Sequence, residues 1–342
     1  MSGVRRRAWI YGGGLAAVAG SLAVVVLLLT PSALVSGLTP ATDTSAASSS
    51  VKHCAVGANP AFPAYDPVNR YIYVPDTGGA SITIVKSTCT VVASIALPSG
   101  AKPFSAAFDP QDNFVYVTDF NLSLVYVISG TTWVATINGG WFDFPIGIVY
   151  DPAAAGMLVT NFDSENVTEI LGTSAFAFYS PGGAPYGIAI DPVFDTIDVA
   201  FPFSDEFSLA YPNQPIYVLP STIYYVGTGD EPLELAYDPA IPAMFVTNDE
   251  SSNVSVFISV NAAEYSVHVG KAPIGVCYST DRQDMYVMNE GSNSVSEIDG
   301  GLTVAKTVKL GSGVAPYGCA YDDATGNMYV TGWTSGQLYV LS

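Results

Sequence analysis

Basic side chains are scarce in this sequence. Of 342 residues only 11 are lysine or arginine, against 30 aspartates and glutamates, and the formal net charge is −19 at pH 7. Arg5, Arg6 and Arg7 stand together at the N-terminus, which leaves eight basic residues for the rest of the chain. Proteins that bind nucleic acid neutralise its phosphates with clustered lysine and arginine. The sequence therefore excludes a nucleic-acid partner.

Side chains typical of common catalytic and metal sites are also few. The chain has two histidines, His53 and His268, and four cysteines. It has no G-x-S-x-G elbow, and no Ser/His/Asp set can be placed at one site. No C-x-x-C or Cys/His pair has the spacing of a zinc site. The sequence thus predicts no catalytic residue and no cysteine or histidine metal centre.

What the sequence does have is a repeat, clearest over residues 103–137. This stretch holds four short runs rich in Val, Tyr, Phe and Thr, at 104–108, 114–118, 123–128 and 133–137. Asp, Asn, Gly and Pro mark the gaps, so the runs are predicted to be β-strands joined by turns. One such unit cannot bury both of its faces, and it requires neighbours of the same kind.

Seven copies of this unit follow one another. An Asp-Pro turn or its variant recurs at Asp66, Asp109, Asp151, Asp191, Asp238, Ser279 and Asp322. A proline stands six residues earlier each time, at Pro60, Pro103, Pro145, Pro185, Pro232, Pro273 and Pro316. A third motif keeps the same phase, as YVPD (73–76), YVTD (116–119), LVTN (158–161), FVTN (245–248), YVMN (286–289) and YVTG (329–332). Four strands every 40–47 residues predict an all-β fold, a seven-bladed β-propeller of four-stranded blades over residues 51–342.

On these motifs the chain resembles the YVTN-type seven-bladed β-propellers, which are common among archaeal surface-layer and other extracytoplasmic proteins. The resemblance covers roughly residues 51–342. It implies the fold and an extracytoplasmic setting. It says little about function, because the shared motifs are strand and turn residues.

The N-terminal 50 residues have a different character. Residues 1–7 form a basic stub, and the apolar run 8–29 is long enough to cross a bilayer as a helix. We expect segment 8–35 to be a transmembrane anchor, with the basic stub in the cytoplasm and the propeller outside the cell. The alternative is a cleaved signal peptide with a site near 35–37. Residues 36–50 are predicted to be a Ser/Thr-rich tether.

The seventh unit ends early, because no fourth strand follows residues 337–342. Residues 51–55 precede the first unit and are not assigned to it. We expect them to form the outer strand of the last blade, which would tie the two ends of the ring together. The alternative is a loop over 51–58.

The residues at the third and fourth positions after each opening proline predict how neighbouring blades pack. The side chain at the third position is larger on average, and the one at the fourth position is small. Adjacent residues of a strand face opposite sides of the sheet, so the third position of one blade can meet the fourth position of its neighbour. Cys277 (fourth position, unit six) and Cys319 (third position, unit seven) are therefore predicted to form a disulfide. Cys54 lies 6 residues before the opening proline Pro60, and Cys89 lies 14 residues before the opening proline Pro103. That offset is roughly 26 Å along a strand, so no bridge is expected between them.

Three N-glycosylation sequons occur, at Asn121, Asn166 and Asn253. We predict them as glycan acceptors in an extracytoplasmic protein. Asn166 and Asn253 occupy the same repeat position, however, so both are equally consistent with turn residues that spell a sequon by chance.

Acidic residues gather in the loops between the second and third strands. Because these loops lie on the same face as the loops that lead into the first strands, they would form a ring. A Ca²⁺ site is predicted there, since carboxylate oxygens suit that ion, from Asp163, Glu165, Asp249, Glu250 and Glu290. No D-x-D-x-D-G loop fixes it. The alternative, which applies above all to Asp76 and Asp119, is local turn formation.

Aromatic residues stand beside these acids. The loop 139–144 and the segment 201–216, where the fourth unit is longest, are expected on the same face as Trp333. Flat apolar rings beside hydrogen-bond acceptors suit a glycan or a peptide. The predicted ligand-binding residues are Trp141, Phe142, Asp143, Phe203, Asp205, Glu206, Phe207 and Trp333. The alternative is that the rings pack on each other as a cap.

Glu234 completes this predicted face. It stands two positions after its proline, where five copies have serine or glycine, and is expected near the channel mouth as a functional acid or a hydrated carboxylate. The sequence predicts a membrane-tethered binding or surface-structural module for a glycan, peptide or surface-layer partner. The alternative function is a lactonase-like or metal-assisted hydrolase at the channel mouth.

Overall fold

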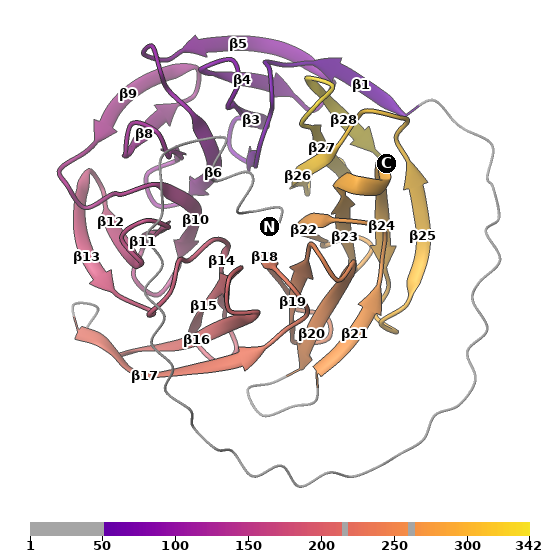
Figure 1. Cartoon of the computed structure of the whole chain (residues 1–342). Coiled ribbons are helices and arrows are strands. Elements are labelled where there is room, and N and C mark those ends of the chain that lie inside the picture. The colour runs from indigo at the N-terminus through magenta and orange to yellow at the C-terminus, as the bar shows by residue number, and fades with distance from the viewer. Residues whose placement is uncertain (1–50, 214–217, 259–263) are drawn as a thin grey trace, which may run out of the picture.

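The computed structural model describes residues 51–213, 218–258 and 264–342, which form a ring of seven four-stranded antiparallel sheets (Figure 1). The predicted seven-bladed propeller is thereby confirmed. Residues 1–50, with the expected anchor and tether, lie outside the described residues. Over the described part of the chain, no helix has the length and apolar character to cross a membrane.

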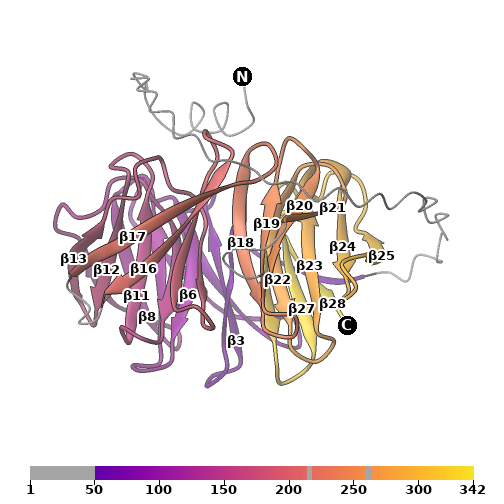
Figure 2. The same cartoon turned by 90° about the horizontal axis from the view of Figure 1, so that it is seen from below.

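Each blade runs outward from the axis as four strands, which are consecutive in the chain in blades 1 to 6 (Figures 1 and 2). The first strands of blades 1 to 7 are β2 (Ala64–Asp66), β6 (Pro103–Asp109), β10 (Pro145–Asp151), β14 (Ile188–Asp191), β18 (Pro232–Asp238), β22 (Pro273–Ser279) and β26 (Pro316–Asp322). The second strands are β3 (Tyr71–Asp76), β7 (Phe114–Asp119), β11 (Gly156–Asn161), β15 (Thr196–Phe201), β19 (Ala243–Asn248), β23 (Asp284–Asn289) and β27 (Asn327–Gly332).

The third strands are β4 (Ser81–Lys86), β8 (Leu124–Ser129), β12 (Asn166–Leu171), β16 (Glu206–Asn213), β20 (Asn253–Ile258), β24 (Ser294–Ile298) and β28 (Gln337–Leu341). The outer strands are β5 (Thr90–Ala96), β9 (Thr132–Ile137), β13 (Ser174–Tyr179), β17 (Val218–Gly227), β21 (Glu264–His268), β25 (Val304–Lys309) and, in blade 7, β1 (Lys52–Ala55). A short 3₁₀ turn, η1 (Glu290–Ser292), follows β23.

The two faces of the ring are built from different turns. First strands begin, and second strands end, at what we term the entry face, as the pairing of Pro103 with Asp119 shows. At the opposite exit face each Asp-Pro turn is closed by its own aspartate. The Oδ1 atom of Asp66 accepts the Val68 amide at 2.8 Å, and that of Asp109 accepts the Gln111 amide at 2.8 Å. These are Asx-turns, which explains why aspartate recurs there.

Size pairing across the blade interfaces follows the predicted pattern. The fourth position of one blade packs against the third position of the next, as Ala64 does with Ala106 and Ala107 with Ile148. Ala189 and Leu235 make the same pair between blades 4 and 5. In the pairs Ala107 with Ile148 and Ala189 with Leu235 a small side chain lies against a large one, whereas Ala64 and Ala106 are both small.

The recurring Tyr and Thr of the second strands connect neighbouring blades by hydrogen bonds. The Tyr73 hydroxyl in blade 1 donates to the Gly130 carbonyl in blade 2 at 2.8 Å, near the exit face. Closer to the entry face, the Thr160 hydroxyl accepts the Gly147 amide at 2.8 Å and donates to the Tyr186 carbonyl of blade 4 at 2.7 Å. The motif is therefore explained by the assembly of the ring.

The chain closes as expected. Strand β1 pairs antiparallel with β28, with Lys52 opposite Val340 and Ala55 opposite Gln337. The first residues of the propeller thus complete its last blade, and no open interface is left between blades 7 and 1 (Figure 1).

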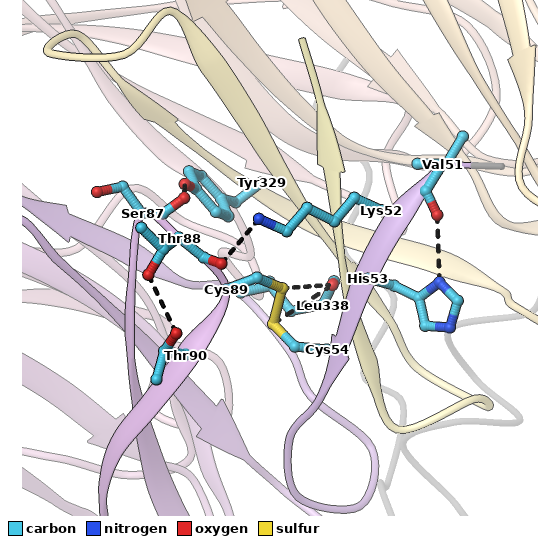
Figure 3. Close-up of a disulfide and its surroundings, with 10 residues drawn as sticks. All are labelled: Val51, Lys52, His53, Cys54, Ser87, Thr88, Cys89, Thr90, Tyr329 and Leu338. Carbon is cyan, nitrogen blue, oxygen red and sulfur yellow. Dashed lines mark hydrogen bonds between the residues drawn. A yellow bond between two sulfur atoms is a disulfide. The ribbon is translucent and has the colours of Figure 1, made fainter. Parts of the chain in front are cut away.

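Two disulfides lie on either side of this closing blade. Cys277 and Cys319 join blades 6 and 7, as predicted. Cys54 and Cys89 are also joined, with Cα atoms 5.7 Å apart, so the expectation that they would stay apart was wrong (Figure 3). Sheet twist turns the outer strands along the circumference, so residue counts along them do not measure height on the ring axis (Figure 1).

The extra length of blade 4 is not an entry-face loop, which corrects the expectation for residues 201–216. Strand β16 ends at Asn213 and strand β17 begins at Val218, so most of the added residues lengthen the hairpin that these two strands form. Only residues 202–205 form the turn on the entry face. Alternation along β16 buries Phe207 and Leu209 against blade 5, with 1% and 6% of their surface exposed.

The two disulfides should contribute strongly to stability because each closes a loop of the unfolded chain. Their sequence separations are 35 and 42 residues. Replacing Cys54 and Cys89 together by alanine should lower the free energy of unfolding by about 4 kcal/mol. Denaturant titration of the variant measures this change. A melting temperature that is the same before and after complete reduction of the native chain would contradict it.

Candidate functional site

The repeat separates two kinds of position. Those that recur hold the blades together, whereas the residue before each proline and the residue after each second strand differ in chemistry from blade to blade. In every blade except blade 4, where Pro202 has no amide hydrogen, the two residues are joined at the entry-face mouth by a backbone hydrogen bond, such as Phe162 N to Phe144 O at 3.0 Å and Asp249 N to Glu231 O at 3.0 Å. We term them the crown: Asn59/Thr77, Lys102/Phe120, Phe144/Phe162, Ala184/Pro202, Glu231/Asp249, Ala272/Glu290 and Ala315/Trp333.

One part of the crown belongs to a continuous chain of aromatic rings, which we term the aromatic arc. Neighbouring ring centroids lie 4.7–6.1 Å apart along the series Trp333, Tyr317, Phe104, Phe120, Phe144, Phe162 and Phe203. Such edge and stacked contacts are favourable in addition to burial. Of the rings for which packing as a cap was the alternative, Phe144, Phe203 and Trp333 belong to this arc. At its end in blade 4, Phe203 keeps 37% of its surface exposed, and Trp141 on the neighbouring loop keeps 45%.

Blades 5 and 6 place acids at the crown positions where blades 2, 3 and 7 place aromatic rings. Glu231 and Asp249 of blade 5 are buried at the mouth, and Glu290 of blade 6 is half-buried. Asp205 orders the loop into blade 5, because its Oδ1 atom accepts the Glu231 amide at 2.9 Å. The mouth is thus chemically asymmetric.

The predicted calcium ligands do not converge. They come from three loops: Asp163 and Glu165 are exposed in blade 3, buried Asp249 precedes exposed Glu250 in blade 5, and Glu290 is half-buried in blade 6. Within residues 51–213, 218–258 and 264–342, no three Asp, Glu, His or Cys side chains are grouped so as to hold a metal ion. The Ca²⁺ site stays a prediction to which this geometry adds no support.

The predicted ligand-binding residues divide into two groups. Trp141, Asp143, Phe203 and Asp205 are exposed on the entry face, and Glu206 and Trp333 are half-buried. Phe142 and Phe207 were wrongly placed on that surface. Phe142 is 5% exposed and packs between blades 2 and 3, while Phe207 is 1% exposed between blades 4 and 5. Phe142 lies in the loop before β10, and Phe207 lies in strand β16, whereas the exposed Phe203 belongs to the turn before that strand.

An apolar plug, which the sequence analysis missed, closes the axis below the crown. Every blade supplies one buried residue to a single cluster, which we term the axial plug: Phe62, Phe104, Ile146, Tyr186, Leu233, Ile274 and Tyr317. Contacts cross the axis, with the Tyr186 and Tyr317 hydroxyls of blades 4 and 7 only 3.3 Å apart. The signal was readable, because six of the seven residues directly follow the opening proline.

Glu234 lies beneath this plug and not at the entry-face mouth, which corrects its predicted place. It stands two residues after its proline, where five of the other blades carry Ser105, Gly147, Gly187, Gly275 and Gly318 and blade 1 carries Phe62. A Cβ atom added at Gly187 would come within 3.1 Å of the Glu234 Oε2 atom, so the carboxyl group lies against that glycine. Enclosure in the ring raises the pKa of Glu234 to about 8, and desolvation is the whole cause.

Other enclosed carboxyl groups share this property. Desolvation raises the pKa of Asp76 to about 6 and that of Glu169 to about 7. Glu297 occupies the position equivalent to Glu169 and has the Lys306 ammonium at 2.9 Å. The residue paired with Glu169 on the neighbouring strand is Phe176, whereas the residue paired with Glu297 is Lys306. The structure thus encloses several acids that are ionised only at a cost.

The predicted turn roles of the asparagines are supported. The Oδ1 atoms of Asn166 and Asn253 accept hydrogen bonds from Asn161 and Asn248, each at 2.7 Å, across the turn between strands two and three. Asn121 donates to the Gly100 carbonyl at 2.9 Å. Glycan attachment at the three sequons stays a prediction.

Solved structures share this fold. A streptogramin B lyase matches with a TM-score of 0.74 and 9% identity over 85% of this chain and 97% of that one. Virginiamycin B lyase from Staphylococcus aureus matches with 0.73 and 10%, over 85% and 99%. Kuenenia stuttgartiensis hydrazine synthase matches with 0.71 and 15%, over 89% and 99%. At these identities the likeness shows the fold alone. No family model and no curated protein matches the chain.

The enclosed acids predict that the protein is more stable in acid. Because the folded-state pKa values of Asp76, Glu169 and Glu234 are raised, folding favours their protonated forms. Their contribution is fully present below about pH 4, the ordinary pKa of a carboxyl group, and is lost as the pH rises towards 8. Calorimetry should show a melting temperature that falls from pH 4 to pH 8, with a smaller fall in Glu234→Gln. A rise over that range would contradict this account.

Proposed function

We propose that this protein is a membrane-tethered, extracytoplasmic binding module of the YVTN-propeller type, and that its entry face binds a neutral glycan. The observation that carries the proposal is the exposed pair Trp141 and Phe203 on adjacent loops of blades 3 and 4, beside Asp143, Asp163 and Asp205. Phe162 of the aromatic arc packs against Phe203, with ring centroids 5.5 Å apart.

The chemistry of these residues suits a polyhydroxy ligand. Exposed ring faces accept the C–H faces of a sugar, and carboxylates accept hydrogen bonds from its hydroxyl groups. No lysine or arginine stands on the loops 139–144, 162–165 and 202–206, so an anionic ligand has no counter-charge there. The ring contacts hold the site before the ligand arrives, which lowers the entropic cost of binding.

The proposed cell-surface setting has independent support from the covalent structure. Two disulfides use all four cysteines, which is typical of proteins in an oxidising compartment. The apolar run 8–29 after Arg5–Arg7 supplies the proposed anchor.

A hydrolase or lyase is the second candidate. It is favoured by one observation, the isolated carboxyl group of Glu234, whose pKa of about 8 would suit a general acid. The solved lyases of the same fold make this candidate worth testing. His53 and His268 do not support it, because both lie on outer strands, β1 and β21, far from the axis.

The binding proposal is tested by titrating the full chain, in detergent micelles, against an array of neutral oligosaccharides. Trp141→Ala and Phe203→Ala should each weaken the best ligand about tenfold or more, since loss of one stacking ring costs about 1.4 kcal/mol or more. Trp133→Ala, an equally exposed ring on outer strand β9, is the matched control and should change nothing. Equal loss in all three variants would count against the entry-face site. Selective binding of peptides instead of sugars would overturn the ligand class.

A further inference from the structure

Charge is distributed unevenly around the ring. Residues 103–268, which form blades 2 to 5, contain 20 of the 30 aspartates and glutamates and no lysine or arginine. All eight basic residues that follow residue 50 belong to blades 1, 6 and 7 or to the loops that join these blades to blades 2 and 5. Blades 6, 7 and 1 are neighbours on one side of the ring (Figure 1). The propeller therefore carries its basic groups on one side and most of its acids on the other.

The described chain enters the propeller at a lysine-rich part of the outer rim. Val51 packs in one cluster with Val308 and Leu310 of blade 6. Lys309 stands between those two residues at the end of β25, and Lys52 directly follows Val51 in β1. Both lysines are exposed. The point of entry thus has an exposed lysine on each of the two outer strands that meet there.

Two further lysines extend this surface. The Lys52 ammonium donates to the Thr88 carbonyl at 2.8 Å, in the turn between β4 and β5 of blade 1 (Figure 3). The exposed Lys86 precedes that turn at the end of β4. In β25, Lys306 keeps 53% of its side chain exposed although it pairs with Glu297 at 2.9 Å. We term these four residues the lysine rim: Lys52, Lys86, Lys306 and Lys309.

Acidic side chains are few beside the lysine rim. Strands β25, β1 and β5 contain none. Glu297 is 5% exposed and pairs with Lys306, and Asp299 accepts hydrogen bonds within its own turn. Asp281 and Asp323 are exposed, but they lie in exit-face turns between first and second strands. Within the described residues, this part of the outer rim therefore carries more ammonium groups than carboxylates.

Exposed apolar side chains adjoin the lysines. Val91 and Val92 of β5 are 47% and 37% exposed. They lie just beyond Cys89, which the disulfide joins to Cys54, two residues after Lys52. Lysines beside exposed apolar side chains suit an anionic membrane surface, because the ammonium groups are attracted to lipid phosphates while the apolar groups enter the headgroup layer.

The negative net charge of the whole chain does not prevent such a contact. Exposed charges are screened over about 8 Å at physiological ionic strength. Two opposite four-stranded blades, with strands about 4.8 Å apart, span roughly 30 Å. The acids at the far side of the ring are therefore screened from a surface that the lysine rim touches, and the local lysines decide the interaction.

We propose that the lysine rim docks on the anionic headgroups of the membrane, so that the ring stands on its edge. This inference rests on the proposed function, because it requires the anchor at residues 8–35. The 15 residues 36–50 reach at most roughly 50 Å, which keeps Val51 near the bilayer. Blades 3 and 4, with Trp141 and Phe203, then lie on the side away from the membrane, where a ligand reaches them freely.

The test measures lysine accessibility on the full chain in lipid nanodiscs, with trace amounts of an uncharged amine-reactive ester and peptide mass spectrometry. In phosphatidylglycerol, labelling of the four rim lysines should be about fivefold slower than in phosphatidylcholine. Lys102 and Lys271, in loops of the entry face, are internal controls and should react equally in both lipids. Because the attraction is electrostatic, about 1 M salt should remove the difference.

A matched pair of variants tests the charge itself. Lys309→Glu and Lys271→Glu make the same change at exposed positions, on the outer strand of blade 6 and in the loop that leads into this blade. Lys309→Glu should remove most of the protection of Lys52 in phosphatidylglycerol, whereas Lys271→Glu should leave it unchanged. Equal loss in both variants would overturn the proposal.

Flotation of the full chain with vesicles separates the anchor from the docking surface. A chain that floats with phosphatidylcholine vesicles but shows equal labelling of the rim lysines in both lipids would retain the anchor and overturn the docking. A chain that does not float with these vesicles would contradict the anchor and, with it, this proposal. Protection that is equal in both lipids and increases with protein concentration would indicate contacts between copies and would also overturn it.

Discussion

The ring depends on a hydroxyl group that two blades share. In blades 2, 3, 5 and 7 a threonine on the second strand accepts an amide of its own first strand and donates to a carbonyl of the next blade. Both backbone groups are buried and have little access to water, so leaving them unpaired would be costly. In blade 4, where Ala200 replaces the threonine, the Gly187 amide reaches the Leu233 carbonyl of blade 5 directly at 3.0 Å. The interface therefore satisfies the same backbone groups in two ways.

The recurring residues that hold the blades together lie outside the crown, so the crown residues can differ from blade to blade. Tyrosine, threonine and the small residues of the first strands recur at the blade interfaces, whereas the two crown residues of each blade vary. Some crown residues also bond across blades, since the Asn59 side-chain amide donates to the Trp333 carbonyl at 3.1 Å and the Thr77 hydroxyl donates to the Pro103 carbonyl at 2.6 Å. Blades 2 and 3 place phenylalanines there, blade 5 places Glu231 and Asp249, and blade 7 places Trp333. Below the crown, the plug isolates Glu234, so one seven-fold frame holds two chemically different environments. The asymmetry comes from side chains and not from the backbone.

The sequence was sufficient where the repeat itself carried the information. Blade number, strand order, the closing strand and the Cys277–Cys319 bridge all follow from residues in fixed phase. It was insufficient where three-dimensional twist mattered: Cys54 meets Cys89 because outer strands run around the rim, which a count of residues does not show. Loop conformation was equally hidden. Phe144 and Glu231 adopt left-handed backbone, with φ of 54° and 58°, a conformation uncommon for residues other than glycine. The plug was available in the sequence but needed the ring geometry to be interpreted.

The shared hydroxyl is tested most directly by replacing threonine with its isostere valine and measuring the free energy of unfolding. Thr160→Val leaves the Gly147 amide and the Tyr186 carbonyl without their partner and should cost about 2–4 kcal/mol, since each buried unpaired group costs about 1–3 kcal/mol. Thr307→Val, at an exposed position of outer strand β25, is the matched control and should stay within about 0.5 kcal/mol of the native chain. A Thr160→Val variant as stable as the native chain would contradict the account that these hydroxyl groups hold the blades together.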